Sequence, residues 1–463
     1  METAVVGEAV EAAAGAEAGV EAAPALSKNA QKRLLKASSK ESRKLARKAE
    51  KKIRKAHRSQ MAEEPPSLAS VAPTARAGPP MTAEETRANA WVAWRAFGSP
   101  RLVLAPMVNQ SELAFRLLAR EHGAGLTYTP MLHSTLFATS ETYRRDNFDE
   151  HPSDRPLVVQ FCGDDPDTLL SAARYVEARC DVVDLNCGCP QAIARRGHYG
   201  AFLLDEPELI EAIVRTLSNA LTVPVSVKVR VLPAADGSVD TSATVRFAQR
   251  LEAAGASLLT VHGRTRAQKC ACTADWSTIR AVKEAVRIPV IANGGVERPE
   301  DLEACLQATG CDGVMTSEGA LENPALLAGS PTCRAGQAAL ARSYAAIATA
   351  HPPKGLAVLK AHFFKLLYMA LDVHRDMREK LGAANDATAV FAVVEEVCER
   401  EDAESKRRPD EMSSRCDTED AQWTTWYRRH RGATEAPSDR YGSQPAEVGE
   451  ETCVRDAPPV AAK

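Results

Sequence analysis

Short apolar runs alternate with amphipathic stretches through the middle of the chain. Between most of these runs, apolar residues recur every three or four positions, as in 208–221 and 243–255, which predicts helices. The runs themselves are typical of buried strands: RLVLAP (101–106), GLTYTP (125–130), LVVQFCG (157–163), DVVDLN (181–186), PVSVKVR (224–230), SLLTVHG (257–263), PVIANGG (289–295) and DGVMTS (312–317).

Eight strands separated by crossover helices over about 230 residues favour parallel strands closed into a (β/α)8 TIM barrel. We place this barrel at residues 90–330. A doubly wound open sheet is the structural alternative. That fold usually carries G-x-G-x-x-G after its first strand, and no such motif follows RLVLAP. The barrel is therefore the predicted α/β fold.

Residues 331–401 contain no strand-like run and predict a small all-helical domain attached to the barrel. Within 357–381 one long helix is expected, with 387–400 as its packing partner. The apolar residues at helical spacing in that helix mark a buried stripe: Leu359, Phe363, Leu366, Ala370, Val373, Met377 and Leu381.

Both ends of the chain are polar or low in complexity, and we expect residues 1–89 and 402–463 to be disordered extensions. A basic arm at 28–58 holds fourteen Lys and Arg residues against Glu41 and Glu50. Such an arm suits RNA phosphates, a nuclear import signal, or a solvated segment without a partner. The aromatic and basic cluster WTTWYRRHR at 423–431 suits contact with RNA by stacking and charge, or a disordered tail without a partner.

Charge and composition narrow the class of protein. Lys and Arg number 58 against 61 Asp and Glu, a formal net charge of −3, which excludes a uniformly basic coat but not a local basic patch. No apolar run approaches the ~18 residues that span a bilayer. The first 24 residues lack the Lys or Arg of secretory and mitochondrial leaders. We therefore expect a soluble monomer without a membrane partner, cytoplasmic and/or nuclear, with its twelve cysteines reduced.

Polar and glycine residues gather where the predicted strands end, which is where TIM barrels place their chemistry. The Gly-containing turns after the last two strands suit a phosphate, because backbone N–H groups approach an anion closely there. The candidates are Pro106, Met107, Val108, Gln160, Asn186, Cys187, Cys189, Lys228, His262, Asn293, Gly294, Gly295, Ser317, Glu318 and Gly319.

Two of these residue types define candidate chemistry. Cys187 and Cys189 lack the paired Cys or His spacing of a zinc site, and Cys270 with Cys272 lies two strands later, so no metal is expected. A thiol above a barrel mouth instead suits a general acid or a nucleophile. Lys228 is the cation within an apolar strand and suits stabilising negative charge on a cofactor or intermediate.

The strings LAPMV, VVQFCG, DLNCGCP, VSVKVR, TVHGRT, IANGG and GVMTSEGALENP resemble, in order and spacing, the flavin-dependent tRNA-dihydrouridine synthases. The resemblance runs from about Arg101 to Leu327 and, more loosely, to about Arg400. The stretch GCPQAIARRGHYGAFL (188–203) is most similar to the eukaryotic branch that acts on uridines 16 and 17 of the tRNA D-loop.

The resemblance implies an enzyme that reduces uridine to 5,6-dihydrouridine with FMN, which NADPH or NADH reduces, and with tRNA as its partner. It makes Cys189 the proton donor and Asn186 a residue that helps to hold the target uracil. We expect tRNA to be recognised by its shape and phosphates. The expected contacts are Lys360, Lys365, Arg375 and Arg378 of the helical domain, together with the basic arm, which lies outside the family core. The residues implied at the flavin are Pro106, Met107, Val108, Gln160, Lys228, His262, Asn293, Gly294, Gly295, Ser317 and Glu318.

One departure from the family pattern concerns the phosphate. Many bacterial members carry Gly-Arg where this chain has Ser317-Glu318, and a glutamate cannot bind phosphate as an arginine does. Backbone amides, with Arg264 or His262, are expected to carry more of that contact. Two alternatives stay open: an FMN barrel that reduces a small pyrimidine, and a non-catalytic RNA-binding barrel.

Overall fold

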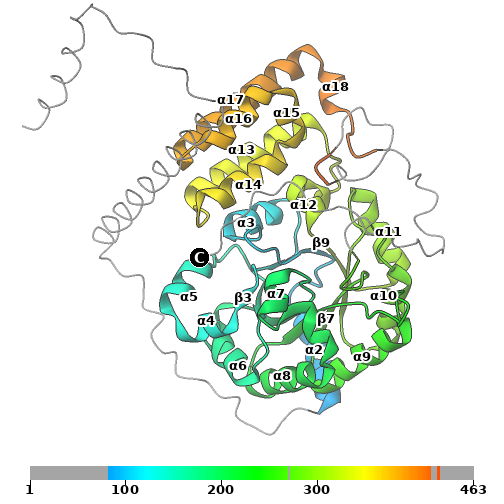
Figure 1. The fold of residues 1–463 in the computed structure, drawn as a ribbon. Helices are drawn as coiled ribbons and strands as arrows, with labels where there is room; N and C mark the ends of the chain where they lie inside the picture. Colours follow the sequence, from blue (N-terminus) through cyan, green and yellow to red (C-terminus); the bar gives the residue numbers. More distant parts are fainter. Residues whose placement is uncertain (1–81, 269–271, 419–424, 428–463) are drawn as a thin grey trace, which may run out of the picture. The chain divides into compact units, whose positions relative to one another are not determined.

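The computed structural model describes residues 82–268, 272–418 and 425–427 (Figure 1). The chain divides into the units Met1–Ala69 and Ser70–Lys463, and all described residues lie in the second unit. The predicted basic arm at 28–58 and all residues after 427 therefore lie outside the described residues.

A closed parallel barrel forms the centre of this unit and confirms the predicted TIM-barrel fold. The sheet runs β2-β1-β9-β8-β7-β6-β5-β4-β3, and a further pairing of β2 with β4 closes it. β3 is an additional short strand beside the end of β4. The strands are β1 (Leu102–Leu104), β2 (Leu126–Tyr128), β3 (Leu132–His133), β4 (Leu157–Cys162), β5 (Val182–Cys187), β6 (Val225–Arg230), β7 (Leu258–His262), β8 (Val290–Asn293) and β9 (Gly313–Thr316).

Helices cover the outside of the barrel (Figure 1), and most of them bury apolar residues. α8 is typical, because Ile210, Ile213, Val214 and Leu217 recur at helical spacing and are buried. The covering helices are α3 (Leu113–Glu121), α4 (Ser134–Thr139), α5 (Glu141–Asn147), α6 (Pro166–Arg174), α8 (Pro207–Ala220), α9 (Thr241–Ala254), α10 (Trp276–Ala285), α11 (Pro299–Thr309) and the short α12 (Glu318–Glu322).

The folded region begins before residue 90. α2 (Ala83–Ala96) starts at an N-cap, where Thr82 and Glu85 form a capping box. Its Trp94 packs with Leu126, Val182 and Leu258, which begin or lie near the beginning of strands, so α2 covers the amino end of the barrel. The boundary predicted at residue 90 is therefore too late. The sequence of α2 is rich in alanine and lacks the strong apolar stripe that would have marked it as a helix.

The helical region contains α13 (Arg334–Ala350), α14 (Leu356–Leu366), α15 (Tyr368–Val373), α16 (Arg375–Ala383), α17 (Ala387–Arg407) and α18 (Pro409–Ser413). The single long helix expected over 357–381 is wrong, because the chain leaves helical geometry at Leu367 and at His374. The breaks keep Phe363, Met377 and most of the predicted stripe buried, but leave Val373 41% exposed.

The predicted boundary at 401 is also too early. α17 continues to Arg407, and Arg334 donates two hydrogen bonds to Glu401 of that helix in a buried ion pair. Farther along, the backbone N–H groups of Trp426 and Tyr427 donate to the buried carboxylate of Glu322 on α12. Part of the predicted disordered tail is therefore packed.

Buried contacts join the helical region to the barrel. Glu112, the residue before α3, accepts hydrogen bonds from Tyr344 Oη at 2.8 Å and His362 Nε2 at 2.9 Å. The His362 ring stacks on Phe115, with ring centroids 4.6 Å apart. Since Glu112 follows the loop after β1, the helical region is attached beside one of the loops that form the barrel mouth. Among the helices of the described residues, none is long and apolar enough to cross a membrane.

Candidate active site

Strand register brings most of the predicted site residues side by side. Asn186 on β5 pairs with Lys228 on β6, Arg230 on β6 pairs with His262 on β7, and His262 pairs with Asn293 on β8. These positions lie at or near the carboxyl ends of strands that share one barrel. A single site at the barrel mouth follows from this register.

Gln160, Asn186 and Lys228 lie within their strands rather than beyond the strand ends. Asn186 Nδ2 donates to Gln160 Oε1 at 2.7 Å, and Gln160 Nε2 donates to Asp184 Oδ2 at 2.8 Å. On its other side, Asn186 Oδ1 accepts from the N–H groups of Gly188 and Cys189, both at 3.0 Å. The amides thus connect the buried barrel interior to the backbone of Cys189.

The side chain of Lys228 lies beside the loop that carries Cys189. A β-carbon built on Gly188 would be 3.7 Å from Lys228 Nζ. Lys228 is only 9% exposed, and its Nζ makes no hydrogen bond or ion pair with the residues that the structure describes. Burial and repulsion from Arg230 lower the pKa of Lys228 to about 8, although Asp184 opposes the shift. A buried cation without such a partner suits an anionic ligand.

Cys189 lies two residues beyond β5 and is partly buried. Burial raises the pKa of its thiol, and the backbone of Gln191 and the cations of Arg230 and Lys228 oppose that shift. The thiol is therefore protonated at neutral pH and can donate a proton. Cys187, by contrast, is a fully buried part of β5.

Arg230 belongs to the site although sequence analysis did not name it. Its Nε donates to Gly188 O at 2.7 Å and its Nη1 donates to Thr265 O at 2.9 Å, so it joins the Cys189 loop to the loop after β7. Arg230 lies two residues after Lys228, so both side chains point to the inner face of β6. This spacing is the feature of the sequence that could have identified Arg230.

His262 lies among cations at the end of β7. Its pKa is well below the usual value because of burial and the charges of Arg230, Lys228 and Arg264. The imidazole is thus neutral and can donate or accept a hydrogen bond. Arg264 Nη1 lies 3.3 Å from His262 Nε2, and Arg264 Nε donates to Cys272 O at 2.5 Å.

The turn after β8 requires glycine. Gly294 and Gly295 have φ values of +107° and +83°, and a β-carbon on Gly294 would lie 2.9 Å from the His262 ring. Asn293 Nδ2 donates to Met315 O at 3.0 Å, and Trp276 Nε1 donates to Gly294 O at 2.9 Å. The turn is therefore held tightly beside His262.

The remaining predicted residues lie on loops at the same end. Pro106, Met107 and Val108 follow β1, where Met107 N–H donates to Ser111 Oγ at 3.0 Å and Val108 is 43% exposed. Ser317 and Glu318 follow β9 and begin α12.

The mouth fits an anionic cofactor. Lys228, Arg230 and Arg264 supply positive charge from β6 and from the loop after β7. Two buried hydroxyls have no hydrogen-bond partner in the described part of the chain: Thr265 Oγ1 in the loop after β7, and Thr316 Oγ1 at the end of β9. Cationic groups and spare hydroxyl donors together suit a phosphate-bearing group. No three metal-ligating side chains come together within 82–268, 272–418 and 425–427.

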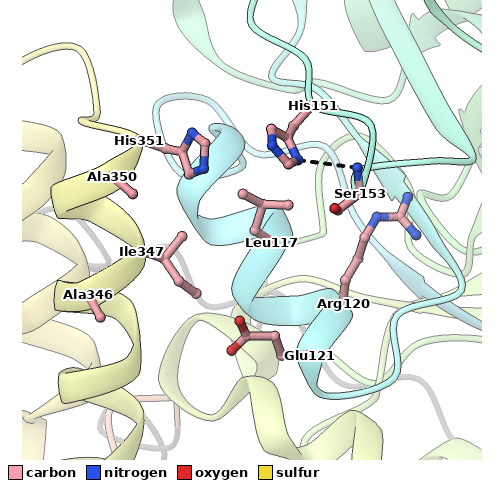
Figure 2. Close-up of a pocket in the computed structure, with 9 residues that line it drawn as sticks. All are labelled: Leu117, Arg120, Glu121, His151, Ser153, Ala346, Ile347, Ala350 and His351. Atoms are coloured by element: carbon pink, nitrogen blue, oxygen red, sulfur yellow. Dashed lines mark hydrogen bonds between the residues drawn. The ribbon is translucent and has the colours of Figure 1, made fainter.

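A cavity of about 450 Å³ lies elsewhere, between α3 and α13 (Figure 2). In it His151 Nδ1 accepts from Ser153 N–H at 3.2 Å, and none of the predicted site residues reaches it. Its lining is Leu117, Arg120, Glu121, His151, Ser153, Ala346, Ile347, Ala350 and His351. This cavity lies between a helix that covers the barrel and a helix of the helical region, α13. It is not the candidate active site.

Lys360 and Lys365, two of the expected RNA contacts on the helical region, donate hydrogen bonds within the protein. Lys365 is 8% exposed, donates to Ala361 O and lies 5.1 Å from the Trp426 ring, so it is part of the packing. Lys360 donates to Gly382 O and Ala384 O, at the end of α16. Sequence periodicity could not show that carbonyl groups at the end of α16 would accept hydrogen bonds from Lys360, or that Lys365 would be buried beside Trp426. Arg375 and Arg378 remain available at the surface.

The sequence profile of the dihydrouridine synthase (Dus) family matches residues 103–408, which include the barrel strands and most of the helical region. The chain belongs to the dihydrouridine synthase family. The predicted family resemblance is thus confirmed.

Several curated relatives of this member of the dihydrouridine synthase family carry specific names. A mouse tRNA-dihydrouridine(16/17) synthase [NAD(P)(+)]-like protein is 49% identical over 304 residues, which cover 65% of this chain and 62% of the relative. The Saccharomyces cerevisiae tRNA-dihydrouridine(16/17) synthase [NAD(P)(+)] is 43% identical over 302 residues, 62% of this chain and 70% of the relative. A human tRNA-dihydrouridine(20a/20b) synthase [NAD(P)+]-like protein is 41% identical over 230 residues, 49% of this chain and 70% of the relative. The match thus spans less than two thirds of the mouse relative's own length.

Proposed function

We propose that this protein reduces uridine to 5,6-dihydrouridine in tRNA, with FMN bound at the barrel mouth and NADPH or NADH as the reductant. The observation that carries the proposal is the arrangement of Cys189, Asn186 and Lys228: a protonated thiol, an amide and an unpaired buried cation at one barrel mouth. The named relatives, at 43–49% identity, support the substrate class and the reductant.

FMN, when bound, would supply hydride to C6 of the uracil. Lys228, Arg230 and Arg264 would hold its negative charge, and the Gly294-Gly295 turn would allow its phosphate to approach the backbone. The neutral His262 would contribute a hydrogen bond without adding charge. Gln160 and the 106–108 loop would line the same mouth.

Cys189 would give a proton to C5 of the same base. Burial keeps the thiol protonated, which is the form that a general acid requires. Asn186 would position this group, since it binds the Cys189 backbone N–H. The target uridine must leave its stacked position to reach a barrel mouth, as in other enzymes that act on a base.

We propose uridines 16 and 17 of the D-loop as the targets, because 16/17 synthases match 302–304 residues and the 20a/20b protein matches 230. The test incubates purified protein with unmodified tRNA and NADPH or NADH, and locates dihydrouridine by mass spectrometry. We expect a yellow flavoprotein that modifies positions 16 and 17 and leaves free uracil unchanged. Reduction of free uracil but not of tRNA would support the small-pyrimidine alternative, and a colourless inactive protein would support the non-catalytic one.

A further inference from the structure

The short helix α7 (Ala192–Arg196) presents positive charge beside Cys189. Arg195 and Arg196 are both exposed, and the side chain of neither makes a hydrogen bond or ion pair with any residue in the described ranges. Many other arginines of this chain are paired, for example Arg266 with Asp205 at 2.7 Å. The side chains of Arg195 and Arg196 are thus unpaired, unlike those of many other arginines in the described part of the chain.

Local carboxylates are committed to other groups and do not neutralise these arginines. The ring of His198 lies between Asp164, 2.7 Å from its Nδ1, and Glu206, 2.5 Å from its Nε2. Asp205 pairs with Arg266. The acidic residues that border the α7 loop thus leave its two arginines with their full charge.

The outer face of α7 is held at a fixed position relative to the thiol. Ala194 is fully buried and clusters with Tyr199 and Cys162, next to the side chain of Cys189. Ala201 N–H donates to Cys189 O at 2.9 Å, and Gly200, at φ +70°, lies so close that a β-carbon on it would be 2.7 Å from the same oxygen. These contacts on the buried side of α7 hold the helix, and with it the two exposed arginines, in a fixed position relative to Cys189.

α7 lies at the carboxyl end of the barrel, where the site is (Figure 1). β5 ends at Cys187 and α7 begins five residues later, at the carboxyl end of the barrel. Figure 1 shows α7 inside the ring of outer helices, in front of the strands. Ile193, 54% exposed, adds an apolar surface next to the arginines.

We propose that Arg195 and Arg196 bind the backbone phosphates of the RNA segment that carries the target uridine. This inference rests on the proposed function. A base that leaves its stack exposes the phosphates on either side of it, and two cations next to Cys189 are placed to bind them. The partner is single-stranded RNA, recognised here by charge rather than by base sequence.

The test compares the double variant Arg195→Ala, Arg196→Ala with wild type for binding of unmodified tRNA between about 50 and 200 mM salt. Each single-strand phosphate contact contributes about 0.7 to the slope of log affinity against log salt, so the slope should fall by about 1.4 and affinity by roughly 10-fold. A matched control, Arg95→Ala with Arg246→Ala, removes the same charge from exposed positions on α2 and α9 and should leave the slope unchanged.

Two further measurements separate this inference from the proposed function. Arg195→Lys with Arg196→Lys should restore the slope, because lysine also neutralises phosphate. Flavin content and the rate of NADPH oxidation in the alanine variant should match wild type, which shows that the pocket is intact. A wild-type salt slope in that variant, or an equal loss in the control, would overturn the inference, whereas inactivity of the wild-type protein on tRNA would overturn the proposed function instead.

Discussion

Asn186 fixes the backbone of Cys189 through a side-chain oxygen. Its Oδ1 accepts the Cys189 N–H at 3.0 Å, while its Nδ2 donates to Gln160, whose own amide donates to Asp184. An ionised carboxylate only accepts hydrogen bonds, so Asp184 sets the orientation of both amides that follow it. The position of the thiol thus depends on a carboxylate buried deeper in the barrel.

Replacing Asp184 tests this dependence. Asp184→Ala removes the acceptor that orients Gln160, and the Cys189 backbone loses its fixed position. We expect the rate of dihydrouridine formation to fall roughly 10- to 100-fold, as small displacements of catalytic groups do. Single-turnover kinetics with saturating tRNA measure this rate.

Ser226→Ala is the matched control for Asp184. Ser226 Oγ donates to the other oxygen of Asp184 at 2.5 Å, so its loss removes a buried hydrogen bond but leaves the Asp184–Gln160 bond intact. The serine variant should keep a rate close to wild type. Equal rate losses in both variants would show that Asp184 acts only through general stability.

Lys228 makes cofactor affinity depend on pH. Its pKa is lowered to about 8 in the ligand-free protein, so the ammonium loses its proton between about pH 7 and 9. FMN titrations of the apoprotein should show weaker binding as pH rises through this window. In Lys228→Met the affinity should be low and should not change there, and a wild-type pH dependence in that variant would contradict the assignment.

The same lowered pKa affects stability with the opposite sign. Between about 8 and the ordinary 10.5, the unfolded chain binds a proton that the folded chain has released. This lysine alone therefore makes the apoprotein more stable as pH rises through that window. Urea unfolding of wild type and Lys228→Met at pH 8 and 10 should show a smaller gain in the variant.

Glu112 attaches the helical region to the barrel. Despite burial, which raises it, the pKa of Glu112 is lowered by His362 and by the hydrogen bonds from His362 and Tyr344. Its stabilising contribution is present above the ordinary value of 4.5 and is lost as pH falls through the lower, folded value.

Removing that carboxylate leaves two buried partners unsatisfied. Glu112→Ala should lower the free energy of unfolding by about 3 kcal/mol, measured by urea denaturation. Glu121→Ala, at an exposed position at the end of α3, should change it little. If the two variants are equally stable, the contact between Glu112 and His362 does not stabilise the attachment.

The strand pattern predicts the barrel because each parallel strand is buried on both faces and reads as an apolar run. Residues near strand ends are predictable for the same reason, since register follows from strand order. Gln160 and Lys228 were therefore identified, although they lie inside their strands.

Features that depend on tertiary contacts were not predictable in this way. β3 is only two residues long, and α2 shows a weak apolar stripe. The breaks at Leu367 and His374 arise where α14, α15 and α16 fold against α13 and α17, and no proline or glycine marks them. The sequence shows Asp184 only as a polar residue within a buried strand. Its hydrogen bonds in the structure are what show that it orients Gln160.

The most direct test of the proposed chemistry concerns Cys189 as the proton donor. In Cys189→Ala the protein should bind FMN and oxidise NADPH as wild type does, while dihydrouridine formation in a single turnover falls at least about 100-fold, the usual contribution of a general acid. Cys187→Ala, at the buried position in β5, should keep wild-type chemistry. A wild-type rate of dihydrouridine formation in Cys189→Ala would contradict the assignment of the thiol as the proton donor.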